Sequence, residues 1–181
     1  MKRLYYLTYS VDSTEQISKD LHAHGVNDWR FHVVSKDEAG LFNHHVHSAS
    51  ILYRTDMVRF VERGVILGGL IGCAAILPLA LAFNNVFTLP MGAWLTMGLF
   101  SMVLGAWVGC FGGISSENYK IRRFHDAIEK GQYLVMIDAP KIQVEEIKVL
   151  MQAKHSEAQL QLEDSTITNP FAGIDGKVHI T

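Results

Sequence analysis

The sequence is poor in cysteine, in proline and in charge. Its 181 residues include two cysteines, four prolines and only 19% charged residues, with a formal net charge of −2. Small secreted disulfide scaffolds are dense in cysteine, so that class is excluded. The slightly acidic balance lacks the basic footprint of a nucleic-acid-binding domain, and no nucleic-acid partner is expected. Cys73 and Cys110 lie among apolar residues with no neighbouring base, which indicates packing rather than nucleophilic catalysis.

Charge is missing altogether from Gly64 to Ser116, where no Lys, Arg, Asp, Glu or His occurs. The run is too long for one buried helix and long enough for two membrane spans, since a span needs about 20 apolar residues. We predict helical spans at Gly64–Phe83 and Met91–Ile114, joined by a turn at Asn84–Pro90, because backbone groups in lipid must bond within the helix. Pro78 should kink the first span or be tolerated through packing. A soluble protein that buries both helices is the less favoured alternative.

Basic residues flank the uncharged run on both sides, and the loop between the spans carries no charge. The positive-inside rule therefore places both termini in the cytoplasm and the loop across the membrane. The same side chains could also contact anionic lipid headgroups. The spans contain no ionisable residue, which argues against a proton relay or a charge-coupled carrier. The flanking residues are Arg54, Arg59, Arg63, Lys120, Arg122 and Arg123.

Glycines recur every four residues in both predicted spans. This spacing places small residues on one stripe of each helix, where two backbones can approach closely. Two interpretations remain open: the stripes pack the two spans against each other within one chain, or at least one stripe faces a neighbouring subunit. The six predicted helix-packing residues are Gly64, Gly68, Gly72, Gly105, Gly109 and Gly113.

The flanks of the hairpin each predict a strand, a helix and a strand. Before the hairpin, Arg3–Thr8 and Trp29–Ser35 are rich in aromatic and branched residues, and the helix between them begins at a capping box, Ser13 with Gln16, and ends at Gly25. After the hairpin, the corresponding elements are predicted at Tyr133–Ile137, Gln143–His155 and Ala158–Glu163. In the last strand, Leu160 and Leu162 are expected on one face.

Two such βαβ units are the halves of a ferredoxin-like sandwich. Neither half can bury its elements alone, so we predict one four-stranded sheet backed by two helices, with the membrane hairpin inserted between the halves. Met57, Phe60 and Val61 of a first helical stalk should pack against Phe124 of a second one. The predicted divisions are a first half-domain at 1–55, a stalk at 56–63, the hairpin at 64–114, a stalk helix at 115–131, a second half-domain at 132–164 and a flexible tail at 165–181.

Three segments of the chain carry a resemblance. They are Arg3–Leu7, the stretch from Arg54 through Asp56 to Gly64, and Arg123–Gly131. Through them the chain resembles small bacterial inner-membrane proteins of uncharacterised function, the DUF1269-like group. The resemblance implies a ferredoxin-like cytoplasmic domain on a glycine-rich hairpin. Some similar sequences carry a magnesium-transport label, which gains little support here because the chain has no Gly-Met-Asn motif and no carboxylate in the membrane.

Histidines cluster between the second predicted strand and the first span. His44, His45 and His47 could bind a divalent metal ion, since imidazole suits Zn, Cu or Ni, and His45 and His47 would share a side if this stretch were extended. A solvated polar connector is the simpler interpretation. We expect no cofactor beyond such an ion.

Nucleotide-binding and hydrolase motifs are missing from the sequence, so an enzyme is not expected. The leading hypothesis is a non-enzymatic homo-oligomer in the bacterial cytoplasmic (inner) membrane, with a scaffolding or sensing role for its cytoplasmic domain. One alternative is a small ion channel or transporter, in which a ring of hairpins lines a pore with Thr96 and Ser101. Another is a regulator that binds a divalent metal through the histidine segment.

Overall fold

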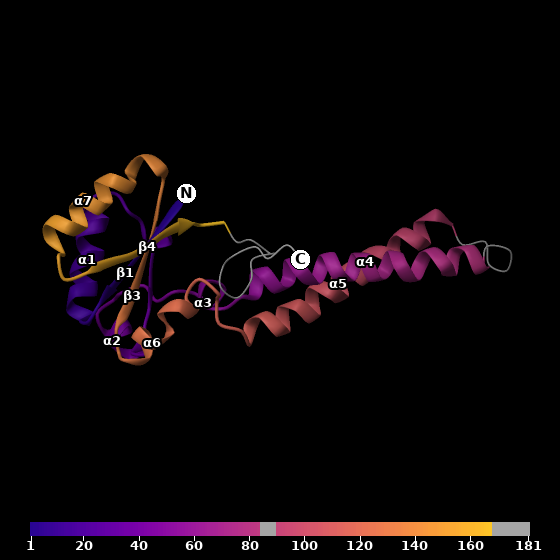
Figure 1. Cartoon of the computed structure of the whole chain (residues 1–181), viewed down its shortest axis with the longest axis horizontal. Coiled ribbons are helices and arrows are strands. Elements are labelled where there is room, and N and C mark those ends of the chain that lie inside the picture. Colours follow the sequence, from indigo (N-terminus) through magenta and orange to yellow (C-terminus); the bar gives the residue numbers. More distant parts are fainter. Residues whose placement is uncertain (84–89, 168–181) are drawn as a thin grey trace. The chain divides into compact units, whose positions relative to one another are not determined.

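A computed structural model describes residues 1–83 and 90–167 of the chain (Figure 1). These residues form two compact units. Among the described residues, the first combines 1–54 with 120–167, and the second is built from 55–119. The predicted turn at 84–89 lies outside the described residues, as does the predicted tail from residue 168 onward.

The first unit is built on a four-stranded antiparallel sheet in the order β2-β3-β1-β4. β1 (Lys2–Thr8) lies between β3 (Tyr133–Ala139) and β4 (Gln159–Ser165), while β2 (Phe31–Val34) borders β3. The two central strands are rich in aromatic and branched residues and are buried on both faces, so they lack the polar alternation of a half-exposed strand. Each predicted pair of strands is separated by a strand from the other half of the chain.

Two helices cover one face of this sheet. α1 (Val11–Ala23) follows β1 and α7 (Val144–Lys154) precedes β4, so each predicted βαβ helix is present (Figure 1). Their apolar residues recur at helical spacing and enter a single core with the inward side chains of the strands. This core includes Leu4, Tyr6, Val33, Val135 and Ile137 from the sheet, Ile17 and Leu21 from α1, and Val144, Ile147 and Met151 from α7.

The opposite face of the sheet carries a second core, which the sequence analysis did not predict. Tyr5, Leu134 and Met136 alternate with the residues of the first core and point to this face. They are covered by a 3₁₀ turn, η2 (Arg122–Phe124), and the short helix α6 (His125–Glu129). Phe124 stacks on Tyr5 with ring centroids 5.5 Å apart. The sheet is therefore a layer between two apolar clusters.

The first helix begins earlier than its capping-box pattern predicts. α1 starts at Val11, and the side chain of Ser10 accepts a hydrogen bond from the amide of Asp12 at 3.1 Å. Ser10 is thus the N-cap in place of Ser13, whose hydroxyl donates instead to Glu157. The predicted end is correct, since Gly25 follows the helix with φ of +80°, a conformation that glycine adopts without strain.

The last strand departs from its predicted alternation. A β-bulge shifts the register so that Leu162 pairs with Tyr5 while Leu160 pairs with Tyr6. Directly paired residues point to the same face, so the two leucines lie on opposite faces of the sheet. The prediction that they share one face is wrong, because the bulge inserts Gln161 as an extra residue.

The prediction of a second stalk helix at 115–131 is also wrong. Helix α5 ends at Ile114, and only η2 and α6 are helical between there and β3. Ile121, Phe124 and Ile128 have helical spacing, but all three are drawn into the second core of the sheet. Phe124 therefore packs on Tyr5 rather than on a stalk. Tertiary packing has overridden the local pattern.

The connectors hold further short elements. η1 (Asp28–Arg30) replaces the start of the predicted strand at Trp29, and η3 (Lys141–Gln143) precedes α7. Between β2 and the hairpin lie two helices, α2 (Glu38–Asn43) and α3 (Ile51–Arg54), where a polar connector was expected. Asp37 caps α2 by accepting a hydrogen bond from the amide of Gly40 at 2.9 Å.

Candidate functional site

The second unit is a hairpin of two long apolar helices, α4 (Met57–Phe83) and α5 (Met91–Ile114). Both are long and apolar enough to cross a membrane. In the most apolar 18-residue stretch of each helix, only 6% is buried within the protein. The second span has the predicted bounds. The first predicted stalk is continuous with α4, which also continues through Pro78.

The glycines of the two spans lie where α4 and α5 meet. A Cβ on Gly64 would lie 2.7 Å from the carbonyl carbon of Gly105, and a Cβ on Gly105 would lie 2.9 Å from that of Gly64. A Cβ on Gly109 would lie 2.8 Å from the carbonyl carbon of Phe60. These distances are far below van der Waals contact of about 3.5–4.0 Å, so a side chain at any of these positions would force the backbones apart.

The remaining three glycines are less uniform. A Cβ on Gly68 would lie 3.2 Å from the carbonyl carbon of Ser101 and closer to its oxygen, and one on Gly113 would lie 2.5 Å from the Cα of Met57. At Gly72 the nearest atoms belong to the side chain of Ser101, which can rotate. We call the contact formed by Gly64, Gly68, Gly105, Gly109 and Gly113 the glycine seam. Both stripes thus meet each other within one chain.

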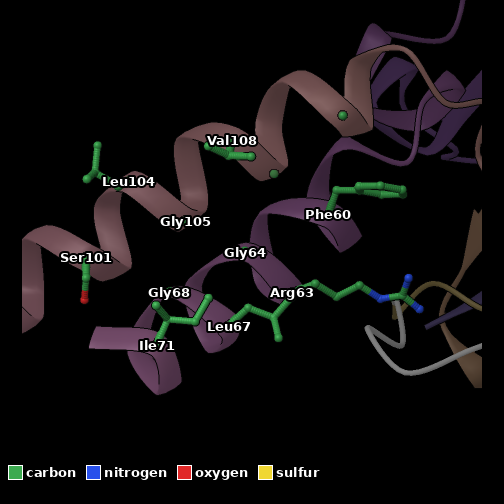
Figure 2. A pocket seen from close by; sticks show the side chains of 12 residues that line it. Phe60, Arg63, Gly64, Leu67, Gly68, Ile71, Ser101, Leu104, Gly105 and Val108 are labelled. Carbon is green, nitrogen blue, oxygen red and sulfur yellow. The ribbon is translucent and has the colours of Figure 1, made fainter. Parts of the chain in front are cut away.

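A groove of about 720 Å³ follows one side of the glycine seam. Figure 2 shows the stretches of α4 and α5 around Gly64 and Gly105, with the branched side chains that line the groove on both helices. These side chains are Leu67 and Ile71 from α4 and Leu104 and Val108 from α5; Phe60, Arg63 and Ser101 also line it. The groove is apolar except for Arg63 and the serine hydroxyl.

The hydroxyl groups that could line a pore bond within their own helix. Thr96 donates to the carbonyl oxygen of Gly92 and Ser101 donates to that of Gly98, each at 2.8 Å. In each hydroxyl the proton is used within the helix, and only the lone pairs of the oxygen remain for another partner. Trp107 is exposed and packs edge-on against Phe111, with centroids 4.8 Å apart.

A polar cluster closes the base of the hairpin. Asp56 accepts a hydrogen bond from the amide of Tyr119 at 3.3 Å and forms an ion pair with Arg59 at 3.0 Å. The Arg59 guanidinium also lies 4.6 Å from the ring centroid of Tyr119. Thr55 and Glu117 form an antiparallel bridge beside this cluster. The chain therefore enters and leaves the hairpin at one point, held by buried polar contacts.

The three predicted metal-ligating histidines are not brought together as a group. His44 is the C-cap of α2, and His45 follows in the left-handed conformation with φ of +55°. The stretch is therefore not extended at His45, which was the condition for His45 and His47 to share a side. His45 and His47 are exposed, and between them Val46 is buried in the first core.

His44 instead meets two carboxylates near the start of α1. Its Nδ1 lies 2.6 Å from Oε2 of Glu15 and 3.7 Å from Oδ1 of Asp12. Hydrogen bonds from Lys19 and His44 lower the pKa of Glu15 to about 2. Asp12 and Glu15 were not predicted, because nothing local in the sequence links α1 to a histidine 29 residues away.

A second polar cluster lies on the sheet. Both carboxylate oxygens of Asp138 accept hydrogen bonds from the guanidinium of Arg3 at 2.6 Å, and both residues are buried. Arg3 lies over the ring of Tyr53, and His32 lies 4.2 Å from the same ring. Burial lowers the pKa of His32, whose Nε2 has no hydrogen-bond partner among the described residues. Arg3 was expected only as a residue of the first strand and of a segment that carries the resemblance, not as a partner of Asp138.

No family model, curated protein or solved structure matches this chain.

Proposed function

We propose that this chain is a non-enzymatic, two-pass protein of the bacterial cytoplasmic membrane, in which the helical hairpin anchors a cytoplasmic domain. The protein would assemble as a homo-oligomer, and the domain would act as a scaffold or sensor at the membrane surface. Anchoring is the role that the observed features support most directly, because the exposed surface of α4 and α5 is apolar along two whole spans.

One observation carries the topology. The first unit is built from residues on both sides of the hairpin, and β1 from the first segment pairs with both β3 and β4 from the second. Two segments that share one sheet must lie on the same side of a membrane. The spans are therefore proposed to form a returning hairpin, and the basic flanks favour the cytoplasmic side.

The sheet order supports the proposed ferredoxin-like architecture. Two βαβ units that interleave, with each pair of strands separated by one strand of the other, form the split arrangement expected for that sandwich. It is also the architecture implied by the resemblance to the small inner-membrane proteins, and we retain that relationship as a hypothesis.

The groove supports the proposed oligomer. Because both glycine stripes pack between α4 and α5, a neighbouring chain cannot insert a helix between them without opening the hairpin. The groove beside the glycine seam offers an alternative: its walls of Leu67, Ile71, Leu104 and Val108 could receive a row of side chains from a second copy. The hydroxyls of Thr96 and Ser101 each donate to their own helix, so their geometry supplies no argument for a pore.

Cysteine labelling tests the topology. In a background with Cys73→Ser and Cys110→Ser, single cysteines would replace Tyr9, Ile142 or Met91, all of which are exposed. We expect a membrane-impermeant maleimide to label positions 9 and 142 only in inverted vesicles. Position 91 should not be labelled from that side. Labelling of positions 9 and 142 from opposite sides would refute the returning hairpin and with it the proposed anchor.

Native mass spectrometry in detergent tests the oligomer. We expect a defined oligomer for the wild type and a smaller species for Leu67→Ala combined with Leu104→Ala. The matched control is Leu81→Ala with Leu99→Ala, which truncates one exposed leucine on each helix away from the groove. A monomeric wild type, or equal effects of the two double variants, would contradict assembly through the groove.

A further inference from the structure

Three metal-ligating side chains from two segments meet on the surface of the α+β unit. Nδ1 of His44, Oε2 of Glu15 and a carboxylate oxygen of Asp12 lie within 4.8 Å of one another. Among these groups, His44 and Glu15 are partly buried and Asp12 is exposed. This cluster is separate from the hairpin and plays no part in the anchoring role proposed above.

The fold holds each of these side chains in place. Asp12 and Glu15 are three residues apart in α1, so they lie on one face near its N-terminal end. The backbone amide of His44 bonds back to the carbonyl oxygen of Gly40, which ends α2 at this residue. Leu41 and Val46, which flank His44, are buried in the core. The imidazole is therefore presented from a fixed backbone position rather than from a free loop.

Lys19 orients the Glu15 carboxylate. It lies one turn further along α1 and pairs with Oε1 of Glu15, which leaves Oε2 to face His44. Outer partners of this kind commonly fix the direction of a ligating carboxylate in metal sites. The arrangement thus contains three candidate ligands and one orienting group.

We propose that Asp12, Glu15 and His44 bind a divalent transition-metal ion of the Zn²⁺ class. At Zn–N and Zn–O bond lengths of about 2.0–2.2 Å, tetrahedral ligand atoms lie roughly 3.4 Å apart. The distances from Nδ1 of His44, 2.6 Å to Glu15 and 3.7 Å to Asp12, lie on either side of that value. Small side-chain rotations therefore suffice to admit the ion.

The donor set selects the kind of ion. An imidazole nitrogen favours Zn²⁺, Ni²⁺ or Cu²⁺ over Mg²⁺ and Ca²⁺, which prefer oxygen ligands alone. Three protein ligands leave a fourth position for water or for a group from a partner molecule. A bound ion would also link the start of α1 to the end of α2, so it would stabilise the folded domain as any ligand specific for the native state does.

The proposed site differs from the histidine run that the sequence suggests. If the run itself bound the metal, His45 and His47 would matter as much as His44. In the proposed site these two exposed histidines contribute nothing, and Asp12 and Glu15 are required. The two schemes share His44, so only the other four residues separate them.

Calorimetric titration of the full-length protein in detergent with ZnCl₂ tests the proposal. We expect one saturable site in the wild type. His44→Ala and Glu15→Gln should each weaken binding by more than the 10–100-fold that loss of an outer partner costs. The matched control, His45→Ala with His47→Ala, should bind as the wild type does. Asp12→Asn replaces the charged carboxylate by a neutral amide at an exposed position, and it should weaken binding by at least tenfold.

Three results would overturn the site. They are the absence of saturable Zn²⁺ binding by the wild type, unchanged binding in Asp12→Asn and Glu15→Gln, and a loss in the double histidine control equal to that in His44→Ala. The last result would assign the ion to the histidine run. The thermal unfolding of each variant without metal, followed by circular dichroism, shows whether it remains folded.

Discussion

Substituting alanine for Gly105 should separate the two helices of the hairpin. The new Cβ would lie 2.9 Å from the carbonyl carbon of Gly64 and 3.0 Å from the Cα of Gly68. Both are backbone atoms, which cannot rotate away as a side chain could. Restoring contact distances of about 3.5–4.0 Å requires a displacement of roughly 0.5–1 Å, and a gap of that size forfeits a quarter to a half of each neighbouring dispersion contact. Overpacking of this kind costs about 1–3 kcal/mol.

Gly98→Ala is the matched control on the same helix. A Cβ on Gly98 would meet only Cδ1 of Ile76, at 3.8 Å, which is ordinary van der Waals contact. Both variants make the same chemical change in a helix interior, so the gain in helix propensity, about 0.5–1 kcal/mol in water, cancels in the comparison. Gly72→Ala should fall between them, because its nearest neighbour is the rotatable side chain of Ser101.

The assay is reversible unfolding in mixed micelles of dodecyl maltoside and increasing SDS, followed by circular dichroism. We expect Gly105→Ala to unfold at a lower SDS fraction than the wild type, and Gly98→Ala at the same fraction or a higher one. If Gly105→Ala and Gly98→Ala unfold at the same SDS fraction, the pairing of α4 with α5 does not depend on close approach of their backbones. The glycine seam would then not be the basis of their pairing.

Two further predictions concern the sheet. Asp138→Asn should lower the free energy of unfolding by about 3–5 kcal/mol, because it leaves the buried guanidinium of Arg3 without its charged partner. Glu163→Gln, at a more exposed ion pair with Lys2, should lower it by about 1 kcal/mol or less. Urea titration followed by far-ultraviolet circular dichroism compares the two variants. Burial raises the pKa of Tyr5 and Tyr6 to about 12. The stability that their protonated hydroxyls confer is therefore complete below pH 10 and is lost as the pH rises from 10 to 12. In a pH titration followed by absorbance at 295 nm, Tyr5→Phe with Tyr6→Phe should remove the tyrosinate signal that appears at the highest pH.

The features that were predicted correctly are those determined by residues close together in the sequence. The second span has its predicted bounds, because an uncharged run between Pro90 and Ser115 leaves little choice in lipid-compatible structure. The strands and their helices were predicted to within a few residues, since apolar spacing reports periods of two and 3.6 residues. The end of α1 just before Gly25 also follows from a property of that one residue.

The features that were missed depend on residues distant in the sequence. Ile121, Phe124 and Ile128 fit a helix equally well as part of a stalk or as the lining of a second core, and only the sheet decides between them. His44 was named as a candidate metal ligand from its residue type, but its neighbours Asp12 and Glu15 come from α1 and are adjacent only after folding. A stripe of glycines likewise indicates that another helix packs closely against it, but it does not identify that helix.

The position of the insertion explains how a sheet can accommodate a hairpin of this size. β2 and β3 are adjacent antiparallel strands, with Val34 paired to Leu134 at the point where β2 ends and β3 begins. The ends of such a pair are already close, about 5 Å apart between Cα atoms. An antiparallel helical hairpin also begins and ends at one place, and here Asp56, Arg59 and Tyr119 hold its two ends together. The contacts at the hairpin base hold the two ends of the hairpin together. They therefore offset most of the entropy cost of loop closure that a flexible insertion between Val34 and Leu134 would carry.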